Sequence, residues 1–350
     1  LVCDGAGVNS TADHTNTRPG PLAPLADRLL EYLSSHSLVA HIASHLRASQ
    51  DSHPLSEERQ HNLLVIAHEH LRPQCSSPAA CLAISPDQPF RLGLLHLLLQ
   101  ATRDPDIALP SLLEDGVPTG AFGPLPCSQQ WPRAANASSP DDCDLELLHC
   151  EQNWTAAEQD PDCVERLVKE EVAQGFVEPF HGTLADAQRA WPLGTAVGKL
   201  NLVKAPGKEP RLVLDSTICH VNARCQIPEH VALPGAGDVR RCFLPEDDRQ
   251  AWEGLSLDFK AAHKCVKVRP ADRGTLLFRV RSQLYFYKVC HFGGRFSAYH
   301  WQRVGATLLR IGHAILSRFP HRAWLYVDDL LAALHRSTCP QQCALLVALL

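Results

Sequence analysis

The spacing of apolar residues changes partway along the chain, and this change limits the fold more than any other feature. Up to residue 102, apolar residues recur every three to four positions, as on one face of a helix. After residue 176, short apolar and β-branched runs alternate with Gly, Pro and charged residues, as in strands. Helices followed by strands mixed with helices predict an α+β protein. The 350 residues, 45% of them hydrophobic, suffice for roughly two domains.

The individual elements follow from the same spacing. Helices are predicted over 21–49, 57–71, 91–102, 162–174 and 297–319. Strands are predicted over 176–180, 200–205, 211–214, 256–259, 276–280, 284–289 and 324–334, the second and third forming a hairpin. The polar residues 1–20 are predicted to be disordered and 104–160, which begin with a stretch rich in Gly and Pro, to be a linker or extended arm. This divides the chain into a helical region, 21–103, and a second folded region, 161–350.

Several classes of protein are disfavoured by composition. The longest apolar runs, such as Leu94–Leu99, are far shorter than the ~18 residues of a membrane span. No secretory signal follows Leu1, so we expect an intracellular protein, in the cytoplasm or nucleus and not secreted. The 14 Cys include no CxxC pair, which favours buried reduced thiols over a zinc site, and the His residues at helical spacing lack a Cys or carboxylate in register. The absence of Met indicates a piece of a longer reading frame.

Charge is distributed unevenly along the chain. Residues 1–198 hold 11 of the 33 Lys and Arg and 26 of the 38 Asp and Glu, whereas residues 199–350 hold 22 and 12. The second part therefore has a net charge of +10 in a chain whose total is −5. Such a field favours a polyanionic partner such as nucleic acid, although a merely solvated basic face explains the charge alone equally well.

Two carboxylate motifs carry the strongest chemical signal. In Tyr326-Val327-Asp328-Asp329, adjacent acids lie between two apolar strand-like runs, which predicts a tight hairpin with the Asp pair at its tip. Asp258 directly follows another apolar run, seventy residues earlier. Carboxylates brought together in this way can hold two divalent ions, which activate a hydroxyl and neutralise a leaving pyrophosphate. An ordinary Asp-rich turn is the alternative interpretation.

Two further segments accompany these acids. Gly293 and Gly294 precede a predicted helix that includes Gln302, and they would allow another chain or a base pair to approach the backbone. Lys204 and Arg211 lie on opposite arms of a turn rich in Pro and Gly, where they could fold over a triphosphate.

In combination and in their order along the chain, these segments resemble the fingers and palm of a reverse transcriptase, and the resemblance extends to DIRS-like retrotransposons. The resemblance covers about residues 160–345. Tyr326-Val327-Asp328-Asp329 resembles the YxDD hairpin of the family, and Leu257-Asp258-Phe259 with Ala262 resembles its first palm motif. Phe292-Gly293 with Trp301-Gln302-Arg303 resembles the glycine-containing motif, and Lys204, Arg211 and Asp215 resemble the fingers pattern.

The resemblance implies a polymerase fingers–palm fold with a small antiparallel sheet packed on helices, preceded by a mainly helical region and truncated before the thumb. It implies template-directed DNA synthesis from RNA, with two Mg²⁺ or Mn²⁺ ions, deoxynucleoside triphosphates, and an RNA or DNA template with a primer. It implies that the ions are held by Asp258, Asp328 and Asp329, that Tyr326 contacts the primer, and that the nucleotide is bound by Lys204, Arg211, Phe259, His263, Gly293 and Gln302.

One departure from the family pattern and two alternative functions stay open. The family usually has Tyr or Phe at the position of His263, so the selection of the sugar is expected to differ. A catalytically inactive nucleic-acid-binding remnant would keep the basic face without the chemistry, and an RNA-templated RNA polymerase would share the palm carboxylates.

Overall fold

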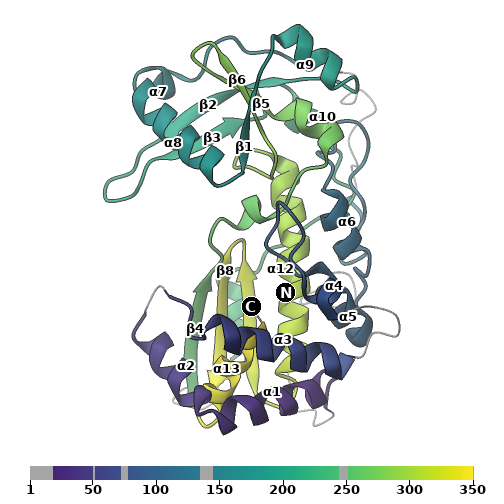
Figure 1. Cartoon of the computed structure of the whole chain (residues 1–350), viewed down its shortest axis with the longest axis vertical. Coiled ribbons are helices and arrows are strands. Elements are labelled where there is room, and N and C mark those ends of the chain that lie inside the picture. Colours follow the sequence, from purple (N-terminus) through teal and green to yellow (C-terminus); the bar gives the residue numbers. More distant parts are fainter. Residues whose placement is uncertain (1–18, 50–51, 72–77, 135–144, 244–250, 350) are drawn as a thin grey trace.

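The structure, a computed structural model, describes residues 19–49, 52–71, 78–134, 145–243 and 251–349. In Figure 1 these residues form an upper and a lower lobe, and one long helix, α12 (Arg295–Ile315), runs between them. The fold is α+β, as predicted, with a small antiparallel sheet packed on helices. The disorder predicted for the first 20 residues concerns a segment that lies, up to residue 18, outside the described residues.

The upper lobe contains a mixed sheet of five strands in the order β1-β6-β5-β2-β3. Strands β2 and β5 are parallel, and the other neighbours are antiparallel. The predicted hairpin is confirmed, with Lys199 paired to Asp215 at one end and Val203 to Arg211 at the other. The five strands are β1 (Val177–Phe180), β2 (Val197–Val203), β3 (Arg211–Asp215), β5 (Leu277–Val280) and β6 (Gln283–Tyr287).

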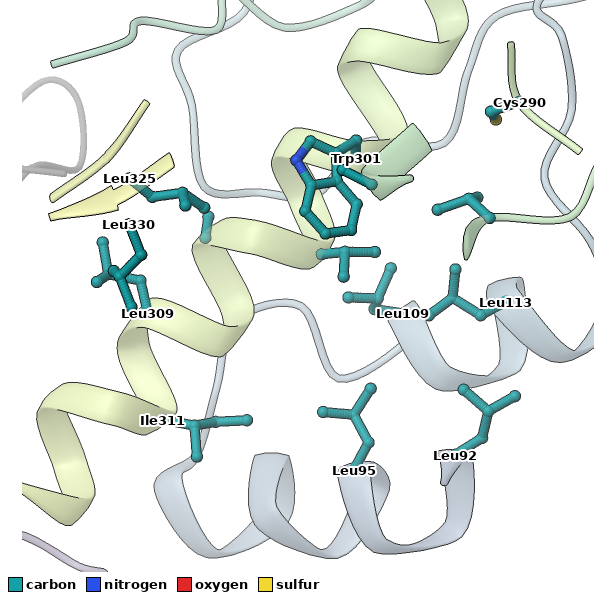
Figure 2. Packing of buried hydrophobic residues seen from close by; sticks show 14 of the residues in the cluster. Leu92, Leu95, Leu109, Leu113, Cys290, Trp301, Leu309, Ile311, Leu325 and Leu330 are labelled. Atoms are coloured by element: carbon teal, nitrogen blue, oxygen red, sulfur yellow. The ribbon is translucent and has the colours of Figure 1, made fainter. Parts of the chain in front are cut away.

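The lower lobe contains an antiparallel sheet of three strands in the order β4-β8-β7. These strands are β4 (Trp252–Asp258), β7 (His321–Tyr326) and β8 (Asp329–His335). One face of this sheet packs on α12, and Figure 2 shows Leu325 and Leu330 of the β7–β8 hairpin beside Leu309 of that helix. Gly305 permits the close approach, because a Cβ there would overlap the Leu325 side chain.

Helices from both ends of the chain cover the lower lobe, where α13 (Cys339–Leu349) packs against α1 and α2. The single helix predicted over 21–49 is interrupted. The Ser35 hydroxyl and the His36 ring both bond to the Tyr32 carbonyl, which ends the first helix, and Ser37 adopts a left-handed φ of 56°. The N-terminal helices are α1 (Ala23–Ser35), α2 (Leu38–Arg47), α3 (Glu57–Leu71), α4 (Pro78–Leu82) and α5 (Leu92–Thr102).

The segment predicted as a linker or extended arm is packed against α12 over its described residues 104–134, and we call this stretch the arm. It contains helix α6 (Leu109–Asp115), which was not predicted because the abundance of Gly and Pro indicated a linker. Pro110 nevertheless lies at the start of the helix, where Pro is tolerated. Asp106, 2% exposed, accepts two hydrogen bonds from Arg303, 1% exposed, and Asp104 accepts two from Arg310. The arm is therefore part of the core.

Several short helices complete the fold, and of these only α8 was predicted. They are α7 (Thr155–Glu158), α8 (Pro161–Ala173), α9 (Leu184–Ala190), α10 (Val221–Arg224) and α11 (Ala236–Arg241), with 3₁₀ turns at η3 (Ala262–Cys265) and η4 (Pro270–Leu276). Among the described residues, every helix is too short or too polar to cross a bilayer.

We predict that stability falls in acid because of His300 on α12. Burial lowers its pKa to about 3, while its Nε2 donates to the Pro118 carbonyl of the arm. The unfolded chain takes up this proton near the ordinary pKa of 6.5 and the folded chain does not, so the free energy of unfolding decreases as pH falls below about 6.5, by up to ~1.4 kcal/mol per pH unit for this group. Denaturant titrations of the parent and His300→Gln at pH 7 and pH 5 check this. The variant should lose less stability over that interval, and an equal loss would assign the effect to other groups.

Candidate active site

The site is built at one end of the three-stranded sheet, where three chain segments end together. Asp258, the last residue of β4, lies directly opposite Asp329, the first residue of β8. Asp329 in turn lies opposite Tyr326, the last residue of β7. Directly paired residues of antiparallel strands project from the same face. The structure therefore places Asp258, Asp329 and Tyr326 in one row, and all three are exposed.

The turn between β7 and β8 consists of Val327 and Asp328. The tip thus lies one residue earlier than the predicted Asp-Asp tip, because Asp329 pairs within the sheet. Val327 has a φ of 56°, which is unusual for a β-branched residue and indicates local strain. The Phe259 amide donates to the Asp328 carbonyl at 3.0 Å, so the turn is tied to the residue that follows Asp258. This hydrogen bond and the short turn keep Asp328, the third carboxylate, at the same end of the sheet as Asp258 and Asp329.

Trp301 of α12 supports both carboxylate segments from beneath. Its indole N–H donates to the Val327 carbonyl at 2.7 Å, and its ring meets the Phe259 ring edge-on with centroids 5.5 Å apart. The side chain is 1% exposed. One buried residue therefore fixes both the strained turn and the end of β4.

We predict that Trp301→Phe loosens this end of the sheet while the lobe stays folded. The ring still packs, but the Val327 carbonyl loses its donor, which should cost about 1–3 kcal/mol. Hydrogen exchange followed by mass spectrometry should show faster exchange over 257–259 and 326–330. Trp191→Phe is the matched control, because the Trp191 indole also donates to a backbone carbonyl, that of Pro270, but in the upper lobe. Unchanged exchange in Trp301→Phe would contradict the assignment.

Three residues predicted to contact a nucleotide lie behind the carboxylates and not at the open face. His263 is 8% exposed and Gln302 4% exposed, and Phe259 is half-buried against Trp301. Burial lowers the pKa of His263, and the negative charge of Asp328 opposes that shift. The exposed Phe292 ring meets the imidazole edge-on at 5.2 Å. The buried Gln302 Oε1 has no hydrogen-bond partner among the described residues.

Lys204 and Arg211 lie in the upper lobe, on the hairpin of β2 and β3. Both are exposed, and the Lys204 ammonium pairs with Asp160 at 2.6 Å, just before α8. The hydrogen bond to Lys204 lowers the pKa of Asp160, and the same bond raises the pKa of Lys204. The structure thus places these two cations at the five-stranded sheet and the three carboxylates at the three-stranded sheet. Helix α12 runs between the two lobes (Figure 1).

Gly293 lies between the hairpin that carries the two cations and the lobe that carries the carboxylates. It is in contact with β3 and comes shortly before α12. Its φ is +107°, and a Cβ would overlap the Leu214 carbonyl oxygen. Asn222 donates to the Gly293 carbonyl at 2.7 Å and accepts from the Arg295 amide at 2.8 Å. Glycine is therefore required at this position by the approach of β3, independently of any ligand.

The three carboxylates alone do not surround a common point as the ligands of a metal ion would. Within the part of the chain that the structure describes, no group of three or more His, Cys, Asp or Glu side chains is gathered as for a metal ion. The site offers hard oxygen donors from two paired strands and one turn, and further ligands would have to come from a substrate.

Sequence reasoning missed two parts of this arrangement. Trp301 was noted only as part of a motif. A buried indole N–H needs a hydrogen-bond acceptor, and this requirement could have indicated that Trp301 supports a neighbouring segment. Asp106, which anchors Arg303 of the same motif, lies 197 residues away in sequence and gave no signal.

Similarity to known proteins is found among solved structures. No family model matches the chain, and no curated protein has a matching sequence. Among solved structures, the chain is similar to the native protease–reverse transcriptase of prototype foamy virus and to a selenomethionine-labelled CSH mutant of it. Each has a TM-score of 0.42 and 17% sequence identity, over 62% of this chain and 26% of that chain. The chain therefore spans about a quarter of the length of the structures it matches.

Proposed function

We propose that this chain carries the nucleotidyl-transfer site of an RNA-directed DNA polymerase from a retroelement. The observation that carries the proposal is the pairing of Asp258 with Asp329 at the open end of a three-stranded sheet, next to a two-residue turn that holds Asp328. Two acids paired directly across strands, with a third in the adjoining turn, have no structural advantage, because like charges facing each other across strands destabilise a sheet. A cationic ligand would remove that cost.

Asp258, Asp328 and Asp329 would hold two Mg²⁺ or Mn²⁺ ions. Carboxylate oxygens suit these hard cations, and Mg²⁺ sites typically combine one or two carboxylates with substrate phosphates. When bound, the ions would activate a primer hydroxyl and neutralise the charge of the leaving pyrophosphate.

The other side chains would bind and orient the substrates. Tyr326, 55% exposed and in the row of Asp329, would contact the end of the primer. Lys204 and Arg211 would bind the triphosphate, and the exposed ion pair of Lys204 with Asp160 is of the kind that contributes little and can exchange for a phosphate. Gly293, which is exposed and lies against β3, would contact the incoming nucleotide. Phe259, His263 and Gln302 would form the wall behind the site, because their side chains are buried or half-buried.

A binding protein without catalysis is the second candidate. The net charge of +10 in residues 199–350 fits a nucleic-acid-binding remnant. Both candidates require that duplex binding weakens steeply with salt, because phosphate contacts release counterions.

Primer extension separates these candidates. The protein is incubated with an RNA template, a DNA primer, Mg²⁺ or Mn²⁺, and either deoxynucleotides or ribonucleotides. Extension with deoxynucleotides is expected. A preference for ribonucleotides would favour an RNA polymerase, and salt-dependent binding of the duplex with no extension under either ion would favour the remnant.

A further inference from the structure

A large groove lies behind the carboxylate site, between the helices that precede the arm and the long helix α12. It encloses about 360 Å³, and Leu64 of α3, Leu95 of α5, Ile311 of α12 and Val347 of α13 contribute to its lining. Figure 2 shows Leu95 and Ile311 on facing helices, with Leu109 and Trp301 above them. A concave, mainly apolar space of this size is typical of sites for small molecules.

The charged side chains that line the groove are cationic. The titratable side chains of its lining include Lys260, Arg91 and His53, and among the described residues neither Asp nor Glu contributes to it. Lys260 is exposed, and it takes part in none of the ion pairs between described residues. Arg91 donates to the Leu82 carbonyl and His53 bonds to the Leu55 backbone, so both are partly engaged. Lys260 is thus the cation available to a ligand at the rim of the groove.

The groove also reaches the support of the carboxylates. Phe259 and Trp301, which stabilise the end of β4 and the turn at Asp328, both line it. A molecule in the groove would therefore contact the far side of the two rings on which the site rests. No residue of the proposed metal set takes part in the lining.

We propose that this groove binds a small amphipathic anion, with its apolar body among the leucines and its carboxylate or similar group on Lys260. The apolar lining supplies affinity in proportion to the area that it covers, and the lone cation selects the charge of the head group. A neutral molecule with the same body would leave Lys260 unpaired, and a cationic one would be repelled. This goes beyond nucleotidyl transfer and does not depend on it.

Calorimetric titration of the full chain with decanoate, without nucleotides or nucleic acid, tests the proposal. Saturable binding is expected, about two- to fivefold tighter than that of decanol, because an ion pair to an exposed lysine adds only a small amount to the affinity. Lys260→Gln should remove this difference while decanol binding is unchanged. Leu64→Trp and Leu308→Trp, which fill the groove from two helices, should each abolish binding. Leu193→Trp, at a position 55% exposed in the upper lobe, is the matched control and should bind as the parent does.

Thermal unfolding of each variant shows that it is folded, and a variant with an early transition is replaced by the other groove-filling one. The proposal is overturned by any of three results: no saturable binding of decanoate, equal affinity for decanoate and decanol in the parent, or undiminished binding in both groove-filling variants.

Discussion

Asp258→Asn is expected to reduce nucleotide incorporation at least ~1000-fold, since ions held by carboxylates supply several kcal/mol of transition-state stabilisation. The substitution keeps the shape of the side chain and removes one negative charge. Asp258 is exposed at the end of β4, so the sheet should be unaffected. Duplex binding should be unchanged or slightly tighter, because a carboxylate near phosphates is repulsive. Single-turnover primer extension and a filter-binding titration measure the two quantities on the same samples.

Asp115→Asn is the matched control, because Asp115 is exposed at the end of α6 and outside the proposed site. It should alter neither quantity. If Asp258→Asn retains the rate of the parent, the ions are not held at this end of the sheet. If neither the parent nor the variant extends the primer above background, the binding remnant becomes the better description.

Asp106→Asn is expected to destabilise the protein by about 3–5 kcal/mol, because it leaves the buried Arg303 guanidinium without its counter-charge. The two side chains are 2% and 1% exposed, and two hydrogen bonds, of 2.6 and 2.9 Å, join them. Burial raises the pKa of Asp106, and the bond to Arg303 opposes that shift. Since domains are typically stable by only ~5–15 kcal/mol, the loss should be evident in urea unfolding.

The double variant Asp106→Leu with Arg303→Met distinguishes the unpaired charge from a general loss of packing. Replacing both partners by apolar groups of similar size often costs little, so the double variant should be more stable than Asp106→Asn alone. A double variant as unstable as the single one would show that the hydrogen bonds to Gln130 and to the Pro126 carbonyl are the greater contribution.

Local patterns predicted much of this structure. The apolar spacing identified α3 (Glu57–Leu71) with its observed bounds, and it located β1, β2, β3 and α8 to within a few residues. The two carboxylate motifs were expected to meet at one end of a small sheet, and the pairing of Asp258 with Asp329 bears this out at the level of the strands. These successes share a cause, because each depends on residues that are close in sequence.

The remainder depends on contacts between distant segments. The burial of His263 and Gln302 follows from how η3 and α12 pack behind the sheet, and the motifs themselves do not contain that information. Lys204 has a partner in Asp160, 44 residues earlier, and the arm has its partners in Arg303 and Arg310. Gly and Pro suggested a linker in the arm, whereas two buried ion pairs hold it to α12. Such pairings become visible only when the topology is known.

The order in which the ribosome makes the strands has a consequence for how this site is formed. After β4 is synthesised, the chain continues with β5 and β6, which belong to the other sheet, then α12 and β7, before β8 emerges. Until then β4 has no hydrogen-bonded neighbour, because β8 separates it from β7. An unpaired strand of an incomplete sheet is prone to associate with other chains, so folding of the lower lobe is expected to require protection during translation. A ribosome that stalls anywhere before residue 329 leaves a chain in which Asp258 faces no partner strand.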